Sequence, residues 1–160
     1  MNTVLYYLTL ASLLGAGLLA GVFFAFSTFV MTAMARLPSE QGISAMQSIN
    51  SAILQSPFML VFMGTAAASL IAGIASFWRL GTTSAVFVLA GSLFIVVGVF
   101  VVTAAFNVPL NDKLAAAASG SQEGARVWKE YLAGWIPWNH VRTIASFAAL
   151  ASFIIGIRKW

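Results

Sequence analysis

The stretch LGTTSAVFVLAGSLFIVVGVFVVTAAFNVPLN, residues 80–111, contains no charged side chain. The hydrocarbon core of a bilayer is about 30 Å thick, and a helix needs roughly 20 apolar residues to cross it. Three further tracts also lack charge: Met1–Ala35, Gln41–Trp78 and Thr143–Ile157. We therefore predict an all-α fold, a bundle of four transmembrane helices over about residues 3–34, 57–78, 84–106 and 139–157.

The composition supports the same class of protein. Charged residues make up 8% of the 160-residue chain and hydrophobic residues 61%, whereas a soluble domain carries about 25% charged residues. The net charge of +4 comes from basic residues scattered among connections and helix ends, without the basic stripe that binds nucleic acid. We predict one integral membrane domain, residues 1–160, that contacts membrane lipids and no nucleic acid.

The first connection has the pattern of an amphipathic helix. Over about residues 42–54, the side chains of Ile43, Met46, Ile49 and Ile53 form one apolar face, and serine and glutamine fill the other. A helix of this kind lies in the membrane interface rather than across the bilayer. We expect it to cover one end of the bundle.

The third connection gives a second amphipathic helix, over about residues 123–135. Trp128, Tyr131 and Trp135 are spaced i, i+3 and i+7, so their rings share one face. Pro137 is predicted to end this helix, because the residue before a proline is disfavoured in the helical region.

Other local signals mark the ends of the spans. Ser56 and Pro57 supply an N-cap and a first-turn proline for the second span, and Asn139 is a suitable N-cap for the fourth. Pro109 is expected to stop the third span.

The first span contains a possible packing surface. Gly17, Gly21 and Ala25 recur every four residues, which lets a neighbouring helix approach closely. The alternative interpretation is that these small residues only occupy space and make no specific contact with another helix. Assembly into a homo-oligomer is left open by this pattern.

The segment WKEYLAGWIPWNHVRT, residues 128–143, combines aromatic and ionisable side chains at the edge of a span. His140 and Arg142 are expected in the first turn of the fourth helix. A cation meets an unfavourable dipole there. Arg142 therefore needs a partner, and the candidates are Glu130, Asp112 or the oxyanion of a ligand.

Two interpretations of this segment remain open at the level of residues. Tryptophan and tyrosine are ordinary anchors at a membrane interface, and a lone histidine is often structural. An aromatic wall beside a few polar groups is also typical of a small-molecule pocket. One histidine and no cysteine do not supply the ligands of a transition-metal site, so we predict no metal and no other cofactor.

Four motifs carry a resemblance to a known family: GVFFAFSTFVM (21–31), GISAMQSIN (42–50), FNVPLND (106–112), and the tryptophans and tyrosine that lead into WNHVRT (138–143). With them the chain resembles the anthrone-oxygenase-like family of small four-helix integral membrane proteins. Some fungal members of that family oxidise anthrones to anthraquinones with molecular oxygen, without metal or flavin. The resemblance implies a related activity as a possibility for this chain. We expect this chain to belong with the bacterial members, most of which have no assigned reaction, and to lie in the inner (plasma) membrane.

The residues present suggest roles in such a reaction. His140 is the candidate base, because a histidine side chain ordinarily changes charge near the working pH, and Arg142 with Asn107, Asn111 or Asn139 would stabilise an oxyanion. The predicted ligand is flat, apolar and partly oxygenated. Its predicted contacts are Asn111, Asn139, Trp128, Tyr131, Trp135, Trp138, Phe23, Ser27 and Asn50.

Three functions remain as hypotheses. The first is a cofactor-independent oxygenase of anthrone-like or other electron-rich aromatic compounds. The second is a non-catalytic membrane module that binds a lipid, quinone or hydrophobic metabolite. The third is an exporter or accessory subunit, which is less favoured because the second and third spans carry no charge.

Overall fold

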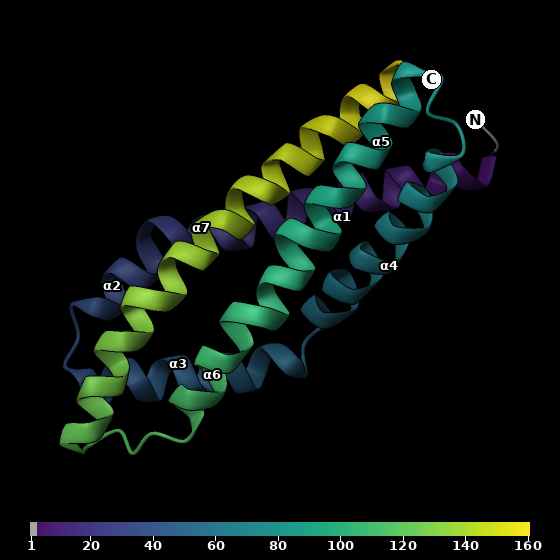
Figure 1. Ribbon diagram of the computed structural model, residues 1–160. Helices are drawn as coiled ribbons and strands as arrows, with labels where there is room; N and C mark the ends of the chain where they lie inside the picture. The colour runs from purple at the N-terminus through teal and green to yellow at the C-terminus, as the bar shows by residue number, and fades with distance from the viewer. Residues whose placement is uncertain (1–2) are drawn as a thin grey trace.

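The structure is a computed structural model that describes residues 3–160. Four helices are long and apolar enough to cross a membrane: Thr3–Ala35, Pro57–Phe77, Thr83–Ala115 and Gln122–Arg158. They lie side by side as a bundle, with the start of the first span and the end of the fourth at the same end of it (Figure 1). The prediction of an all-α membrane fold with four spans is confirmed, and the described residues contain no strand.

The spans are built from the following elements in chain order. The first consists of α1 (Thr3–Ala25), the π-helical η1 (Phe26–Val30) and α2 (Met31–Ala35), and the second is α4 (Pro57–Phe77). The third consists of α5 (Thr83–Leu93), η2 (Phe94–Val101), η3 (Thr103–Asn107) and α6 (Val108–Ala115), and the fourth is α7 (Gln122–Arg158).

The amphipathic helix predicted in the first connection is α3 (Ser39–Leu54). It runs across the end of the bundle that lies away from the chain termini (Figure 1). Gln47 ties it to the third span, because its side-chain nitrogen donates to the carbonyls of Leu114 at 2.9 Å and Ala117 at 3.0 Å. These carbonyls belong to the open C-terminal end of α6, where backbone acceptors lack helical partners.

The helix starts follow the predicted capping chemistry in part. Ser56 caps α4 by accepting from the backbone N–H of Phe58, with Pro57 in the first turn. The predicted stop at Pro109 is wrong, since the third span continues to Ala115. Proline is tolerated there because it follows a π-helical segment and sits in the first turn of α6, where a helical N–H is not needed.

The predicted break at Pro137 is also wrong. The helix α7 runs without interruption from Gln122 to Arg158, so the amphipathic segment and the fourth span form one element. Proline is tolerated inside membrane helices where neighbouring groups satisfy the backbone. Pro137 removes the N–H partner of the Ala133 carbonyl, four residues earlier, and in the same turn the side-chain nitrogen of Asn107 donates to the carbonyl of Trp135.

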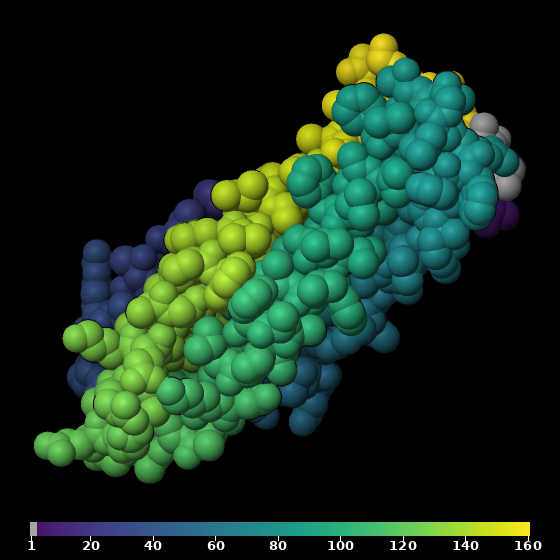
Figure 2. Space-filling model, viewed as in Figure 1, coloured from purple at the N-terminus to yellow at the C-terminus, as the bar shows by residue number. Residues whose placement is uncertain are grey.

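Two apolar clusters form the interior. One fills the bundle between the spans and includes Leu19, Val88 and Phe153. The other lies where α3 meets α2, α6 and α7, and includes Met46 and Tyr131. The outer surface, of which Figure 2 shows one face, also carries large apolar side chains such as Leu18, Leu60 and Ile144, as expected of a surface that faces lipid.

Replacing Gly15 with alanine is expected to destabilise the protein by about 1–3 kcal/mol, the usual cost of overpacking. Gly15 packs directly against Thr65 of α4, because a Cβ there would overlap Oγ1 of Thr65 and lie 2.9 Å from its Cβ. The matched control is Gly21→Ala on the same helix, because no atom lies within 4 Å of its added Cβ. Thermal unfolding in detergent checks this: a melting temperature lowered equally by both substitutions would contradict the packing.

Candidate functional site

A cavity of about 330 Å³ lies between the bundle and α3. This volume falls at the lower end of the range of about 300–1,000 Å³ that is typical of small-molecule sites. Its walls are aromatic, aliphatic and methionine side chains, with four polar residues among them. The lining residues are Val22, Phe23, Phe26, Met46, Ile49, Asn50, Ile53, Leu54, Phe58, Met59, Phe62, Met63, Phe100, Thr103, Ala104, Val108, Asn111, Trp135 and Arg142.

Arg142 is the charged residue in this wall, and it is only 5% exposed. One terminal nitrogen, Nη2, donates to Oδ1 of Asn139 at 2.7 Å, and the other, Nη1, donates to Oγ1 of Thr103 at 3.3 Å. The guanidinium carbon lies 4.5 Å from the ring centre of Phe23 and 5.0 Å from that of Trp135. Contacts of this kind attract the cation to the faces of the rings.

No carboxylate neutralises this cation within residues 3–160. Glu130, one of the partners considered for Arg142, instead pairs with Lys113 and Arg126 on the exposed side of α7. Asp112, the other, is exposed and forms no ion pair with Arg142. A buried charge without a counter-ion is costly, by about 2.5–3.5 kcal/mol even on permissive membrane scales. Of the partners considered from the sequence, only a ligand anion is left.

Asn139 fixes the position of Arg142. Besides accepting from the guanidinium, its amide nitrogen donates to the carbonyl of Phe23 at 2.8 Å and to Oγ of Ser27 at 2.7 Å. Ser27 also shares a hydrogen bond of 2.9 Å with the hydroxyl of Thr143. These contacts join the fourth span to the first just where η1 begins.

The π-helical segments explain why such contacts form at this depth. A π-helical turn shifts the backbone bonding register, leaves a carbonyl open, and is frequent at functional sites. In the first span, the carbonyl of Phe23, three residues before η1, accepts the hydrogen bond from Asn139. In the third span, η2 and η3 present Phe100 and Thr103 to the cavity. These segments were not predicted, since hydrophobic periodicity carries no signal for them.

A second set of polar side chains lies near α3. Asn50 and Asn111 line the cavity, and the hydroxyl of Tyr131 donates to Oδ1 of Asn111 at 2.9 Å. Tyr131 itself is buried beneath them, 1% exposed, and stacks between Trp128 and Trp135. The shared aromatic face predicted on α7 therefore forms a ladder of rings, of which Trp135 reaches the cavity.

Two N–H donors of residues that line the cavity have no hydrogen-bond partner within the part of the chain that the structure describes. They are Nε1 of Trp135 and Nε of Arg142, and both are buried. Close by, Asn107 bonds through its nitrogen to the Trp135 carbonyl, while its own oxygen is unpaired. Buried donors of this sort are rare and call for an explanation, such as a ligand.

The structure thus brings together some of the predicted site residues and not others. Phe23, Asn50, Asn111, Trp135 and Arg142 line the cavity. The supporting layer behind them consists of Ser27, Asn107, Tyr131 and Asn139.

The remaining three predicted residues lie outside the cavity. Trp128 packs in the interior against α3, so closely that a Cβ on Gly42 would lie 2.8 Å from its ring. Trp138 stacks on Phe106 with ring centres 3.7 Å apart. His140 is exposed and does not line the cavity. The role of base for His140 stays a prediction that this placement does not support.

Sequence reasoning missed several residues of the site. Thr103, like Asn139, accepts a hydrogen bond from the guanidinium of Arg142. Phe58, Phe62 and Phe100 form a stacked aromatic wall. An available signal was the spacing of Phe58 and Phe62, one helical turn apart at the start of the second span.

Comparison with protein families gives one match, to the family described as anthrone oxygenase, over residues 58–152, which is more than half of the chain. The matched region runs from the start of α4 through most of α7 and includes Asn107, Asn139 and Arg142. Neither the curated proteins nor the solved structures give a match.

Proposed function

The chain belongs to the anthrone oxygenase family, and on that basis we propose that it binds a flat, weakly acidic aromatic compound in the cavity beside Arg142 and promotes its oxidation by molecular oxygen. Anthrone-like compounds, in which a ring CH₂ group lies opposite a carbonyl, are the proposed substrates. The proposed location is the plasma membrane of a bacterium, where such apolar compounds dissolve.

One observation carries this proposal: a buried arginine without a carboxylate partner in the described residues lines a largely apolar cavity. A cation beside a bound acid favours the ionised form of that acid and so lowers its pKa. In a cavity of low polarity the effect is larger than in water. Arg142 is therefore suited to hold the ligand as an oxyanion.

The chemistry follows from that anion. Loss of a proton from the CH₂ carbon of an anthrone gives an anthrolate, whose charge is shared with the carbonyl oxygen near Arg142. The electron-rich carbon adds O₂, a C–O bond forms, and the peroxide oxygen takes up a proton. The hydroperoxide then loses water as the O–O bond breaks and the second C–H proton leaves. The sum is anthrone plus O₂ giving anthraquinone plus water.

The division of work among the residues is simple in this scheme. Arg142, with the unpaired donor of Trp135, stabilises the oxyanion. The rings of Phe23 and Trp135 hold the flat ligand beside the guanidinium. The lining residues include no aspartate, glutamate or histidine, so the ligand proton passes to water or to a base that is not part of the wall.

The lack of an aspartate, glutamate or histidine among the lining residues also favours a second candidate function. A cavity that provides charge stabilisation without a base is sufficient for a module that binds a quinone or a phenolic metabolite without turnover. Oxygen consumption by the purified protein in lipid, with anthrone as the probe, separates the two. We expect one O₂ consumed for each anthraquinone formed, at a rate well above that of protein-free vesicles. A rate equal to the protein-free rate, with anthrone still bound, would favour the binding module.

Replacing His140 with alanine is expected to change anthrone turnover by less than twofold. The side chain is exposed and outside the cavity wall, and surface substitutions away from a site have small effects, within about 0.5 kcal/mol. The assay is oxygen uptake under saturating anthrone. A loss of a hundredfold or more, the usual contribution of a general base, would restore His140 to the role of base.

A further inference from the structure

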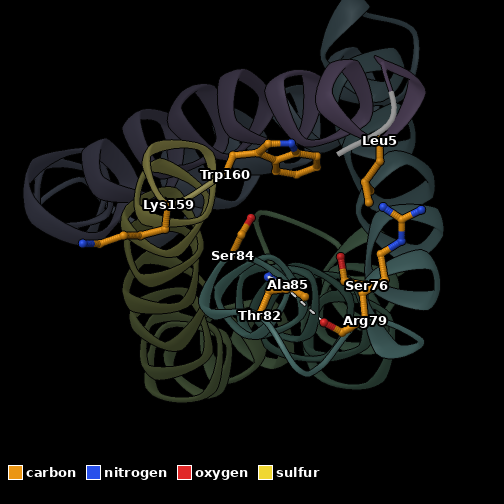
Figure 3. A pocket seen from close by; sticks show the side chains of 8 residues that line it. All are labelled: Leu5, Ser76, Arg79, Thr82, Ser84, Ala85, Lys159 and Trp160. Carbon is orange, nitrogen blue, oxygen red and sulfur yellow. Dashed lines mark hydrogen bonds between the residues drawn. The ribbon is translucent and has the colours of Figure 1, made fainter.

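A second cavity, of about 170 Å³, lies at the end of the bundle that carries the chain termini. It is bounded by the first turns of α1 and α5, the end of α4 and the last residues of the chain. Its lining residues are Leu5, Ser76, Arg79, Thr82, Ser84, Ala85, Lys159 and Trp160. In Figure 3 the Trp160 ring crosses one side of the hollow, Leu5 and the Arg79 guanidinium flank another, and the Lys159 side chain extends away.

The charges of the protein are divided between the two ends of the bundle. The four acidic residues lie in α3, α6 and the first half of α7, at the end that α3 covers: Glu40, Asp112, Glu123 and Glu130. The terminal end holds Arg79, Arg158 and Lys159, and none of these forms an ion pair within residues 3–160. Within residues 3–160, this end therefore has three basic side chains and no acidic side chain.

The hollow also contains hydrogen-bonding groups that suit an anion. The hydroxyl of Ser76 is 1% exposed, lines the cavity, and has no partner in the described residues. The first turn of α5 begins at the same place, after the N-cap Thr82, and a helix N-terminus offers backbone N–H groups and a favourable dipole to an anion. Ser84, by contrast, is already used, because its hydroxyl donates to the Gly156 carbonyl at 2.8 Å.

From this arrangement we propose that the terminal cavity binds a phosphate group, with the head group of an anionic phospholipid as its natural source. Arg79 supplies the charge, and Ser76 and the start of α5 supply neutral donors. The cavity lies where the spans end, so it is at the depth of lipid head groups. Trp160 and Leu5 offer an apolar and aromatic edge of the kind found at that depth. This site is separate from the Arg142 cavity and does not depend on its function.

The test is binding of short-chain phosphatidylglycerol to the delipidated protein in neutral detergent, followed by native mass spectrometry and compared with phosphatidylcholine. Wild type is expected to prefer phosphatidylglycerol. Arg79→Gln is expected to weaken its binding about fivefold, as loss of one basic residue near a lipid surface does. The matched control is Arg36→Gln, an exposed arginine at the opposite end without an ion pair in the described residues, which is expected to leave the affinity unchanged.

Inorganic phosphate added as a competitor identifies the source of the anion. If it fails to displace phosphatidylglycerol from wild type, the lipid head group is the ligand. If it displaces the lipid at low millimolar concentration, the site takes free phosphate. Equal binding of the two lipids to wild type, or equal weakening by Arg79→Gln and Arg36→Gln, would overturn the proposal. Ser76→Ala is a milder second variant that should keep the fold. We expect it to weaken the binding of phosphatidylglycerol and to leave the binding of phosphatidylcholine unchanged.

Discussion

Arg142→Met is expected to weaken the binding of an acidic aromatic ligand by roughly 100-fold, the loss that accompanies removal of a hydrogen bond to a charged group in a buried site. Methionine matches the length of the arginine stem and fits the apolar wall. Hydroxyanthraquinone, which resembles the proposed product and does not turn over, is the probe, and quenching of tryptophan fluorescence reports its binding. Anthrone turnover is expected to fall by a similar factor.

The same substitution is expected to leave the fold intact. It removes a buried cation that has no carboxylate partner among residues 3–160, which relieves about 2.5–3.5 kcal/mol, and it leaves Oδ1 of Asn139 without its donor, which costs about 1–3 kcal/mol. The two terms offset, so the melting temperature should stay within about 3 °C of wild type. Arg158→Met, an exposed position on the same helix, is the control. Unchanged affinity in Arg142→Met would remove the basis of the proposed function.

Asn139→Ala is expected to destabilise the protein by about 3 kcal/mol, with a melting temperature lowered by roughly 10 °C. Its amide makes three hydrogen bonds, to the buried carbonyl of Phe23, to the part-buried hydroxyl of Ser27 and to the buried guanidinium of Arg142. Truncation removes all three bonds, and each buried group that loses its partner carries a penalty, although Ser27 keeps its bond to Thr143. Ligand affinity should fall as well, because Arg142 loses its closest support.

The neighbouring substitution His140→Ala is the matched control for this experiment, since it truncates an exposed side chain on the next residue of the same helix. We expect its melting temperature to equal that of wild type. If Asn139→Ala melted at the wild-type temperature too, the hydrogen bonds between the first and fourth spans would carry none of the stability assigned to them.

Much of the fold could be predicted because the bilayer restricts the choices. Uncharged tracts of sufficient length identified the four spans, and the period of Ile43, Met46, Ile49 and Ile53 identified α3 as amphipathic. Both signals depend on the partition of side chains between water and hydrocarbon, which is visible residue by residue.

The helix ends were harder, for reasons that are not local. Pro109 and Pro137 were expected to stop helices, and neither does. A proline ends a helix only where the backbone groups that it leaves open stay unsatisfied. The turn around Pro137 is also held from outside its own helix, because Asn107 donates to the Trp135 carbonyl from 28 positions away. A pattern read along the chain does not contain that contact.

For the site, likewise, the sequence identified several of the residues but not how the fold places them. The polar residues nominated from the sequence include the cation of the cavity, Arg142, and its support Asn139. The prediction that Arg142 lies in the first turn of a helix was wrong, because α7 begins twenty residues earlier, at Gln122. His140 is two positions from Arg142, yet it faces outward, since side chains two apart on a helix point in different directions. A continuous helix through these residues would have predicted that His140 and Arg142 point in different directions.

The central claim is that Arg142 holds an aromatic ligand as its anion. The most direct test is a pH titration of hydroxyanthraquinone bound to wild type and to Arg142→Met, followed by the visible absorbance of its ionised form. A neighbouring cation lowers the pKa of a bound acid, and one pKa unit corresponds to about 1.4 kcal/mol. We predict a pKa at least about one unit lower when the ligand is bound to wild type than when it is bound to the variant. Equal pKa values for the ligand on both proteins would contradict the account.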